Sequence, residues 1–313
     1  MGQIKEFYSG KNILLTGATG LMGKVLMEKI LTDLPEIRRL YVLIRPKTLP
    51  DGTHLTADNR LWAEILQSSA FEDLRLAQKD KFEEWVREKV EAVPGDLSIE
   101  HLGLDPEVQK RLQKDVDIII NCAAVVSFDA PLDEAITLNT LGPRRIVEFA
   151  RLSNNVKIAH VSTSFVNGMA EGPIPEEPLN LTTKSNPSNP NPLNVANEIA
   201  LISEAISNLE SKSRGFIRRC IFKFEAYSKR ITTPLTFNRQ IEQLRLKWKE
   251  TQLVNLGTQW ARSKGWTDTY TFTKAMGEQI ILEEKGDIPT VILRPAIIEA
   301  GLNRPQPGWL DGF

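Results

Sequence analysis

The sequence NILLTGATGLMG, residues 12–23, joins a short apolar run to a glycine-rich turn that opens onto a helical pattern. The run predicts a buried strand, and the pattern from Leu21 to about Leu31 predicts the helix after it. Glycines at this spacing allow a tight turn, expose backbone N–H groups to a ligand and let helix pack on strand. A chance set of glycines would give only a strand-to-helix turn, but position, spacing and flanking elements together favour a dinucleotide pyrophosphate site. The cofactor contacts predicted here are Thr16, Gly17, Thr19, Gly20, Leu21, Met22 and Gly23.

Further apolar runs recur along the chain, separated by helical patterns. The runs that predict strands are 40–44, 90–93, 116–120, 156–161 and 290–293. Apolar residues at helical spacing predict surface helices between 57 and 90, a helix from Pro131 to about Leu152, and another from about Tyr270 to Glu284. Alternating strands and helices predict an α/β fold, namely a Rossmann-type doubly wound parallel sheet with helices on both faces. Its active site should lie beyond the carboxyl ends of the strands.

Composition limits the classes of function that need consideration. The 313 residues, 41% hydrophobic and 25% charged, describe a globular protein with enough apolar material for a large core. A net charge of -1 gives no general attraction to nucleic acid, so no nucleic-acid partner is expected. Cys122 and Cys220 lack metal-ligand spacing and suit a reducing compartment. No apolar run reaches the roughly 20 residues of a bilayer span and no signal region begins the chain, which predicts a cytoplasmic protein without a metal site.

The residues after the other strands bear on the choice of cofactor. NAD-selective sites carry an acidic residue at the end of the second strand, where it accepts from the ribose 2′-hydroxyl. Arg45 holds that position here, and a guanidinium favours a 2′-phosphate, so NADPH is the predicted cofactor; the alternative is an ordinary solvated arginine. After the third strand Asp96 can accept from the adenine amino group, and small residues after the fourth let the cofactor lie against backbone. Contacts are predicted at Asp96, Leu97, Asn121, Ala123 and Ala124.

A tyrosine and a lysine lie four residues apart on the last predicted helix, at Tyr270 and Lys274. This spacing puts both side chains on one helix face. A nearby ammonium stabilises a phenolate and lowers the pKa of a tyrosine, which suits a proton donor in carbonyl reduction. Because Y-x-x-x-K is common on amphipathic helices, the pair gains its weight from the hydroxyl-rich segment 162–168, which follows the fifth strand at the cofactor end of the sheet.

Together these segments resemble the extended short-chain dehydrogenases, through T-G-A-T-G-x-x-G, N-C-A-A, S-T-S-x-V-x-G and Y-x-x-x-K. The resemblance implies a catalytic triad of Thr163, Tyr270 and Lys274, in which Lys274 also binds the nicotinamide ribose. It also implies that Asn139, in the segment N-x-x-G, is the family's structural asparagine at the cofactor site. Pro295 and Ile297, after the sixth strand, are implied as further cofactor contacts.

Longer motifs narrow the resemblance to the fatty acyl-CoA reductases of the bacterial type. They are V-L-I-R-P at 42–46, N-C-A-A-x-V-x-F at 121–128, S-T-x-x-V-N-G at 162–168, W-x-D-T-Y-x-F-T-K at 266–274, L-R-P at 293–295 and P-x-P-G-W at 305–309. Such enzymes reduce a long-chain acyl-CoA with NADPH to a fatty aldehyde, a fatty alcohol or both. Family members continue with a further helical domain, so the resemblance implies that residues 1–313 form a reductase domain that is incomplete at its C-terminus.

About a hundred residues separate Thr163 from Tyr270, and they predict a helical insert at about 173–262. Residues 173–192 are rich in Pro and Asn and predict a loop, whereas 199–209 and 237–253 show helical spacing. Three interpretations stay open: contact with CoA phosphates, peripheral contact with an anionic membrane, or solvated helices. The basic residues of the insert are Arg214, Arg218, Arg219, Lys223, Lys229, Arg230, Arg239, Arg245, Lys247 and Lys249.

Three other functions compete with an acyl-CoA reductase. The reductase module of a carboxylic acid reductase would take its acyl group from a carrier-protein thioester, but no adenylation or carrier region precedes Gly17. A nucleotide-sugar epimerase shares the fold, although the long insert fits it less well. A non-catalytic NADP-binding regulator is the alternative outside enzymes. Acyl chain length, final product and oligomeric state have no signal in the sequence.

Overall fold

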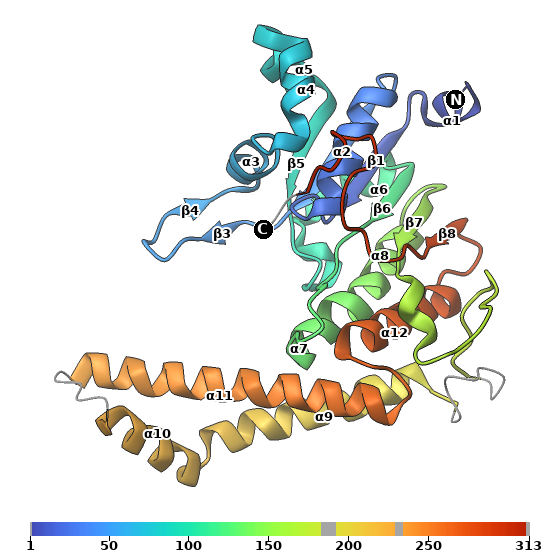
Figure 1. Ribbon diagram of the computed structural model, residues 1–313. Helices are drawn as coiled ribbons and strands as arrows, with labels where there is room; N and C mark the ends of the chain where they lie inside the picture. Colours follow the sequence, from blue (N-terminus) through green and yellow to red (C-terminus); the bar gives the residue numbers. More distant parts are fainter. Residues whose placement is uncertain (1, 183–191, 229–233, 311–313) are drawn as a thin grey trace. The chain divides into compact units, whose positions relative to one another are not determined.

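The computed structural model describes residues 2–182, 192–228 and 234–310, and within them a six-stranded sheet with every neighbouring pair parallel (Figure 1). The strand order is β5-β2-β1-β6-β7-β8, which is the order 3-2-1-4-5-6 of a Rossmann fold when these strands are numbered along the chain. The predicted fold class is therefore confirmed. The strands are β1 (Asn12–Thr16), β2 (Arg39–Ile44), β5 (Val90–Pro94), β6 (Ile118–Asn121), β7 (Lys157–Val161) and β8 (Thr290–Leu293).

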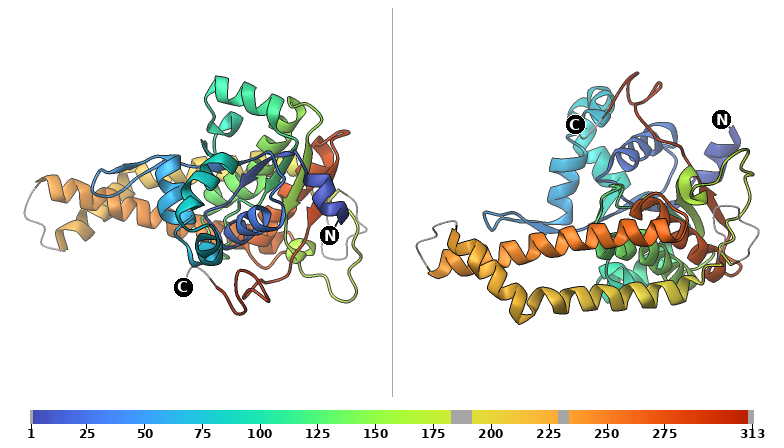
Figure 2. Two further views of the ribbon diagram at one scale, coloured as in Figure 1. Left: turned by 90° about the horizontal axis from the view of Figure 1, so that it is seen from above. Right: turned by 60° about the horizontal axis from the view of Figure 1, so that its bottom comes forward.

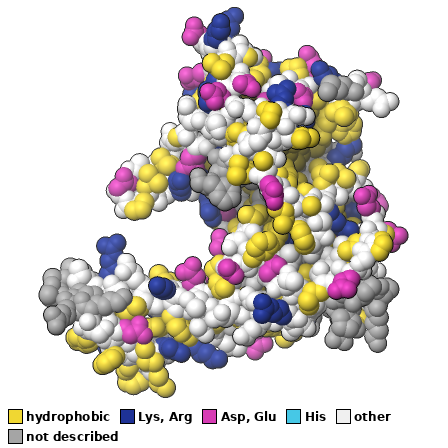
Figure 3. Space-filling model, in the orientation of Figure 1, with side chains coloured by type: hydrophobic (Ala, Val, Ile, Leu, Met, Phe, Trp, Pro, Cys, Tyr) yellow, Lys and Arg dark blue, Asp and Glu magenta, His cyan; other side chains and the backbone are white. Residues whose placement is uncertain are grey.

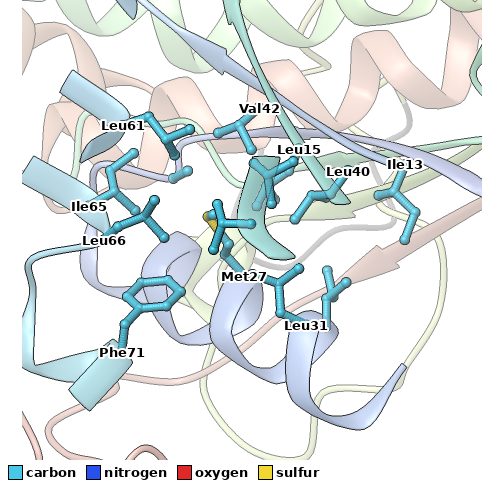
Figure 4. Packing of buried hydrophobic residues seen from close by; sticks show 14 of the residues in the cluster. Ile13, Leu15, Met27, Leu31, Leu40, Val42, Leu61, Ile65, Leu66 and Phe71 are labelled. Carbon is cyan, nitrogen blue, oxygen red and sulfur yellow. The ribbon is translucent and has the colours of Figure 1, made fainter. Parts of the chain in front are cut away.

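One face of the sheet buries a large apolar cluster (Figure 4). Alternate residues of the central strands, such as Ile13 and Leu15, meet Met27 and Leu31 of helix α2 (Leu21–Asp33). Each such fully buried side chain stabilises the fold by about 1.5–3 kcal/mol. This packing fixes α2 against the sheet, so the turn that begins the helix is held at the carboxyl end of β1.

Helices cover both faces of the sheet, and α2 and α6 lie on opposite sides of it (Figure 2). The region 57–90, predicted as surface helices, is broken into short helical pieces, and Lys79 at φ 47° interrupts it. A hairpin of two-residue strands, β3 (Lys47–Thr48) and β4 (His54–Leu55), was not predicted, because strands this short leave no pattern. The remaining elements before β7 are α1 (Gly2–Tyr8), α3 (Ala57–Arg60), a π-helix (Leu61–Ile65), α4 (Glu72–Gln78), α5 (Phe82–Lys89), α6 (Pro106–Asp115), α7 (Leu132–Ala135), a π-helix (Ile136–Thr140), α8 (Leu141–Arg151) and 3₁₀ turns at Ser69–Phe71, Lys79–Lys81 and Glu100–Gly103.

The chain divides into two compact units. The sheet unit comprises Met1–Ala124, Leu141–Ser164 and Ile280–Phe313, and the helical unit comprises Val125–Thr140 and Phe165–Gln279. The helical unit contains the predicted insert together with the segments that flank it. The prediction of one reductase domain with an insert at about 173–262 stays a prediction.

Three helices follow one another in the insert, and the 3₁₀ turn Ser164–Asn167 precedes them. They are α9 (Val195–Arg214), α10 (Phe216–Ser228) and α11 (Pro234–Ser263), and α12 (Thr269–Glu284) comes next. Helices α9 and α11 lie side by side (Figures 1 and 2). Both extend well beyond the predicted segments, and α10 was not predicted as a separate helix. Residues 183–191 of the predicted loop, and the basic residues Lys229 and Arg230, lie outside the described residues.

Ion pairs within and between α9 and α11 involve three of the insert's basic residues, Arg214, Arg245 and Lys249. Glu210 of α9 accepts from Arg214 at 2.6 Å and from Arg245 of α11 at 3.0 Å, and Lys249 of α11 lies 3.2 Å from it. Arg245 also donates to Glu242. These guanidinium and ammonium groups lower the pKa of Glu210 to about 2, with the Arg214 hydrogen bond the largest cause. The ionised carboxylate therefore holds α9 against α11.

Acid should weaken this contact. A carboxyl group whose pKa falls from 4.5 in the unfolded chain to about 2 in the folded one stabilises the folded state above pH 4.5. That stability is lost as the pH falls from about 4.5 to about 2. We expect Glu210→Gln to lower the thermal midpoint at neutral pH and to flatten this acid dependence, followed by helical circular dichroism. Glu204→Gln, an exposed position on the same helix, is the matched control; an equal effect of both changes would contradict the role of Glu210.

Candidate active site

Two glycines of the turn after β1 are required by close backbone contacts. Gly17 has φ +76°, and a Cβ there would lie 2.6 Å from the backbone nitrogen of Ala123. A Cβ on Gly23 would lie 2.2 Å from the carbonyl oxygen of Gly17. Gly20 is different, because its backbone is extended and its Cβ would meet only the Gly17 carbonyl oxygen at 3.6 Å. Backbone packing within the protein thus requires glycine at positions 17 and 23, whereas the space beside Gly20 is open.

The N-terminus of α2 has the character of an anion site. Gly20 is its N-cap and gives no side-chain hydrogen bond to the first-turn N–H groups, and no acidic residue stands in that turn. Such N–H groups and the helix dipole favour a bound phosphate. Thr19 and Gly20 are exposed, and Leu21 and Met22 are half-buried. These residues fit the pyrophosphate of a dinucleotide.

A buried chain of polar side chains joins the ends of β1, β6 and β7. Thr16 Oγ1 donates to Asn121 Oδ1 at 2.6 Å and accepts from the Ala123 N–H at 3.3 Å. The Asn121 amide nitrogen lies 3.0 Å from His160 Nδ1. Thr16 and Asn121 therefore hold the floor of the predicted cofactor site together. The sequence reasoning missed His160, although a histidine within the apolar strand 156–161 was the available signal.

The ends of β2 and β5 bring Arg45 and Asp96 together. Arg45 Nη1 lies 3.7 Å from Asp96 Oδ2, and the Arg45 side chain is 63% exposed. The other carboxylate oxygen of Asp96 accepts from the backbone N–H and the hydroxyl of Ser98. Arg60, which the sequence reasoning missed, donates to the Arg45 carbonyl at 2.5 Å. Arg60 also donates to Glu64 at 2.6 Å, so its charge is paired and it holds the backbone of Arg45 in place.

Neighbouring predicted contacts differ in exposure. Leu97 is buried, and its carbonyl accepts from Arg145 at 3.0 Å. Ala123 and Ala124 are half-buried. Leu97 therefore packs inside the protein and presents little exposed surface to a cofactor.

Backbone hydrogen bonds carry the β7–β8 pairing beyond the strands. The Ser162 N–H donates to the Leu293 carbonyl at 2.7 Å, and the Ser164 N–H donates to the Pro295 carbonyl at 2.9 Å. Thr163 lies between them and is buried. The hydroxyl predicted for catalysis thus follows β7 at the carboxyl end of the sheet, next to the Pro295 backbone, whereas Ile297 is 67% exposed.

In the helical unit, the motif W-x-D-T-Y-x-F-T-K forms the beginning of α12. Trp266 is fully buried, donates from Nε1 to the Val166 carbonyl at 3.0 Å and packs against Phe272. Asp268 Oδ1 accepts from the Thr271 N–H at 2.8 Å, which satisfies one of the free N–H groups at the helix start. These residues set where α12 begins and how it is oriented within its unit.

Tyr270 and Lys274 lie one turn apart on α12, as the sequence predicts. Lys274 is 2% exposed and Tyr270 is half-buried. The Tyr270 ring meets the Phe128 ring edge to face, with centroids 6.0 Å apart. A phenol with a lysine one helical turn away, both sheltered from solvent, is an arrangement that can move a proton to a carbonyl oxygen.

Asn139 ties the loop after β6 to α12. Its Oδ1 accepts from the Val125 N–H at 2.8 Å, and its Nδ2 donates to the Val125 carbonyl at 3.0 Å and to Thr273 Oγ1 at 3.1 Å. Thr140 Oγ1 donates to the Thr273 carbonyl at 2.9 Å. Thr273 and Thr140 were missed, since nothing in their spacing marks them. They fix the helix between Tyr270 and Lys274.

The predicted site residues thus form two groups. The sheet unit gathers the glycine turn, Arg45 with Asp96, the residues after β6 and Thr163 at the carboxyl ends of its strands. The helical unit gathers Asn139, Tyr270 and Lys274 around α12. Among the helices of the described residues, none has the length and apolar composition of a membrane span.

Comparison with known proteins gives consistent relatives. Residues 15–313 match the model of the NAD-binding family described as Male sterility protein. The chain is 33% identical to the alcohol-forming fatty acyl-CoA reductase of Simmondsia chinensis, covering 100% of this chain and 56% of that protein. It is 34% identical to probable fatty acyl-CoA reductase 5 of Arabidopsis thaliana (98% and 55%) and 30% identical to fatty acyl-CoA reductase 1 of Gallus gallus (100% and 48%). The chain thus spans about half the length of the curated relatives it matches.

Solved structures show the same fold at low identity. The terminal R domain of the myxalamid PKS-NRPS pathway aligns with a TM-score of 0.54 at 19% identity, over 93% of this chain and 50% of that one. The reductase domain of a non-ribosomal peptide synthetase from Mycobacterium tuberculosis aligns with a TM-score of 0.52 at 21% identity, over 94% and 50%. These likenesses agree with the Rossmann-type fold of the sheet.

Proposed function

The chain belongs to the Male sterility protein family of NAD-binding domains, and from that premise we propose that it reduces long-chain fatty acyl-CoA with NADPH. The resemblance to fatty acyl-CoA reductases that its motifs indicate is confirmed by the family match and by the identities over nearly the whole chain. A nicotinamide cofactor follows from the family. The preference for NADPH, the acyl-CoA substrate and the residue roles below are part of the proposal.

Helix α12 carries this proposal. Lys274 is almost fully buried one turn from Tyr270, and Asn139, Thr140 and Thr273 hold the intervening turn by hydrogen bonds. The burial of Lys274 distinguishes this pair from a tyrosine and a lysine on a solvated helix surface. In a reductase, Tyr270 would serve as the proton donor, with the Lys274 ammonium as its neighbouring cation.

NADPH, when bound, supplies hydride to the carbonyl carbon of the thioester. Thr163 and Tyr270 would donate hydrogen bonds to the carbonyl oxygen as it gains negative charge, a form of stabilisation worth several kcal/mol. Lys274 would hold the nicotinamide ribose and keep the Tyr270 pKa low. The resulting hemithioacetal loses its C–S bond, so that CoA thiolate and an aldehyde leave. A second reduction with a proton from Tyr270 would give the alcohol.

The cofactor would be held by the residues that gather at the carboxyl ends of the strands. The N–H groups of the first turn of α2 would bind the pyrophosphate, Arg45 the 2′-phosphate and Asp96 the adenine amino group. Asn139, whose side chain bonds to Val125 and Thr273, would act by positioning the loop beside the nicotinamide. The other contacts we propose are Thr16, Gly17, Gly23, Leu97, Asn121, Ala123, Ala124, Pro295 and Ile297.

The test is incubation with NADPH and palmitoyl-CoA. Nicotinamide absorbance, free thiol and extracted lipid are measured together, and we expect one CoA released for each aldehyde formed. Turnover only with an acyl group on a carrier-protein pantetheine would instead favour the carrier-dependent module. Tight NADPH binding without turnover of any acyl thioester would contradict the proposal and favour a regulator.

Cofactor preference gives a separate prediction. Replacing Arg45 with glutamine removes the exposed guanidinium, so we expect NADPH affinity to fall by about tenfold or more while NADH affinity hardly changes. Affinity is measured by quenching of protein fluorescence. Arg38→Gln removes an exposed arginine just before the opposite end of β2 and should change neither affinity. Equal losses for both cofactors at position 45 would show that Arg45 does not meet the 2′-phosphate.

A further inference from the structure

Helix α10 exposes an apolar face. Phe216, Ile217, Phe224 and Tyr227 are 83%, 75%, 77% and 70% exposed. At 3.6 residues per turn, positions 216, 220, 224 and 227 follow one another along one side of a helix, and 217 and 221 lie next to them. The exposed apolar residues of α10 are Phe216, Ile217, Cys220, Ile221, Phe224 and Tyr227; we call them the α10 face.

The opposite side of α10 is anchored. Phe222 and Ala226 are buried, and the Phe222 ring packs against Trp248 of α11 with centroids 6.2 Å apart. The Arg218 guanidinium lies over the same indole, 4.4 Å from the ring centre. At the edge of the α10 face, Tyr227 meets Phe237 of α11, with centroids 4.6 Å apart. The side of α10 that carries Phe222 and Ala226 packs against α11. The helix therefore cannot also bury the α10 face against α11.

Two basic residues, Arg219 and Lys223, border the α10 face on one side. By helical geometry Arg219 and Lys223 fall beside Phe216 and Tyr227, and Arg218 falls beyond Ile221 on the other border. Glu225, the acidic residue of this helix, falls on that same border, between Ile221 and Arg218. The space-filling view shows hydrophobic side chains gathered at the lower left, with Lys and Arg side chains beside them (Figure 3). In contrast to Arg245 and Lys249, these basic residues do not belong to the network around Glu210.

We propose that the α10 face docks on an anionic lipid surface. A helix with aromatic and aliphatic residues on one side, and basic residues along a border, lies in the plane of a membrane with the apolar side among the acyl chains. The cations then meet the phosphates of the headgroups. This partner goes beyond the proposed function and does not depend on it, since lipid contact requires neither cofactor nor substrate.

A second copy of the chain fits this surface less well. In a two-fold symmetric contact, the α10 face of each copy would meet the same face of the other. Where the two helices are antiparallel, Arg219 and Lys223 of one copy would then stand near the same cations of its partner, and facing like charges oppose association. An anionic membrane instead satisfies both the apolar centre and the border formed by Arg219 and Lys223.

The first experiment measures binding of the full chain to vesicles by sedimentation, without cofactor or acyl-CoA. With phosphatidylcholine vesicles containing about a third phosphatidylserine, we expect Phe216→Glu with Phe224→Glu to lower partitioning about 100-fold or more. Leu76→Glu with Ile99→Glu is the matched control, because it puts the same charge on two exposed apolar residues outside α10. Equal losses in both variants would overturn the proposal, and unchanged circular dichroism confirms that each is folded.

The basic border of the α10 face, formed by Arg219 and Lys223, gives a second test. Arg219→Gln with Lys223→Gln should weaken binding to the anionic vesicles about 25-fold, since each cation near such a surface contributes about fivefold. Binding to pure phosphatidylcholine should not change. If this variant instead raises the KM for palmitoyl-CoA and leaves vesicle binding intact, the cations serve CoA phosphates and the proposal is overturned.

The third test measures which side of α10 enters the lipid. An environment-sensitive fluorophore on Cys220 should shift its emission to the blue when vesicles are added. The same fluorophore on Glu225→Cys in a Cys220→Ser background should shift less, because that position lies about 140° around the helix from Cys220. Equal behaviour of the two positions would refute insertion of this face. Self-association in sedimentation velocity, abolished by Phe216→Glu with Phe224→Glu and without vesicle binding, would identify a second copy as the partner instead.

Discussion

Replacing Tyr270 with phenylalanine should lower the rate of acyl-CoA reduction by about 10²–10⁴-fold, the usual contribution of a positioned proton donor. The ring keeps its edge-to-face contact with Phe128, so the helix and its packing should not change. The rate is measured in single-turnover stopped flow by loss of NADPH absorbance. NADPH affinity, measured by fluorescence, should stay near that of the wild type.

The control for this substitution is Tyr8→Phe, which removes the hydroxyl of a half-buried tyrosine in the first helix of the chain. We expect it to leave the rate unchanged. A normal rate for Tyr270→Phe would remove this tyrosine from the mechanism, and with it the role proposed for α12. A loss of cofactor affinity equal to the loss of rate would instead assign Tyr270 to binding.

Substitutions at two glycines of the turn should separate folding from cofactor binding. In Gly23→Ala the new methyl group would lie 2.2 Å from the Gly17 carbonyl oxygen, so backbone must move. Forcing extra volume into a packed site costs about 1–3 kcal/mol, which denaturant unfolding will measure. In Gly20→Ala the methyl group has room, and losing a glycine N-cap costs at most about 1 kcal/mol.

For NADPH affinity, in contrast to stability, we expect a large effect from Gly20→Ala. The Gly20 methyl group would stand beside the N–H groups of α2 that we expect to bind the pyrophosphate, so NADPH affinity should fall about tenfold or more. Isothermal titration with NADPH measures this loss at a temperature where both variants are folded. If Gly20→Ala binds NADPH normally, the phosphates do not lie at the start of α2.

The sheet was largely readable from the sequence because its strands are short continuous apolar runs. The central run 12–16, buried on both sides, became a strand with the predicted bounds, and so did the run 290–293, although it forms an edge strand in which Val291 and Leu293 are exposed. The hairpin of β3 and β4 could not be predicted from the sequence, because two-residue strands have no periodicity. Similarly, a break at Gly215, where the backbone is extended, separates α9 from α10 and was not anticipated.

The site was readable only where a motif names the residue. Spacing alone put Tyr270 and Lys274 on one helix face, and they lie one turn apart on α12. Contacts between distant segments have no local pattern, so Thr140 and Thr273 escaped notice, as did Arg60 beside Arg45. The basic residues of the insert looked alike in sequence, although Arg245 is held by two carboxylates and Arg219 borders an exposed apolar face.

The π-helix Ile136–Thr140 gives this region an unusual sensitivity to length. In a regular α-helix, consecutive residues point about 100° apart, whereas here Asn139 and Thr140 both reach Thr273. A π-helical turn accommodates an additional residue, and deleting one residue would restore the ordinary register. One of the two contacts with Thr273 would then be lost, even if the deletion left both Asn139 and Thr140 in place. Natural variation in this segment should therefore consist of substitutions, while insertions and deletions are confined to the loops around it.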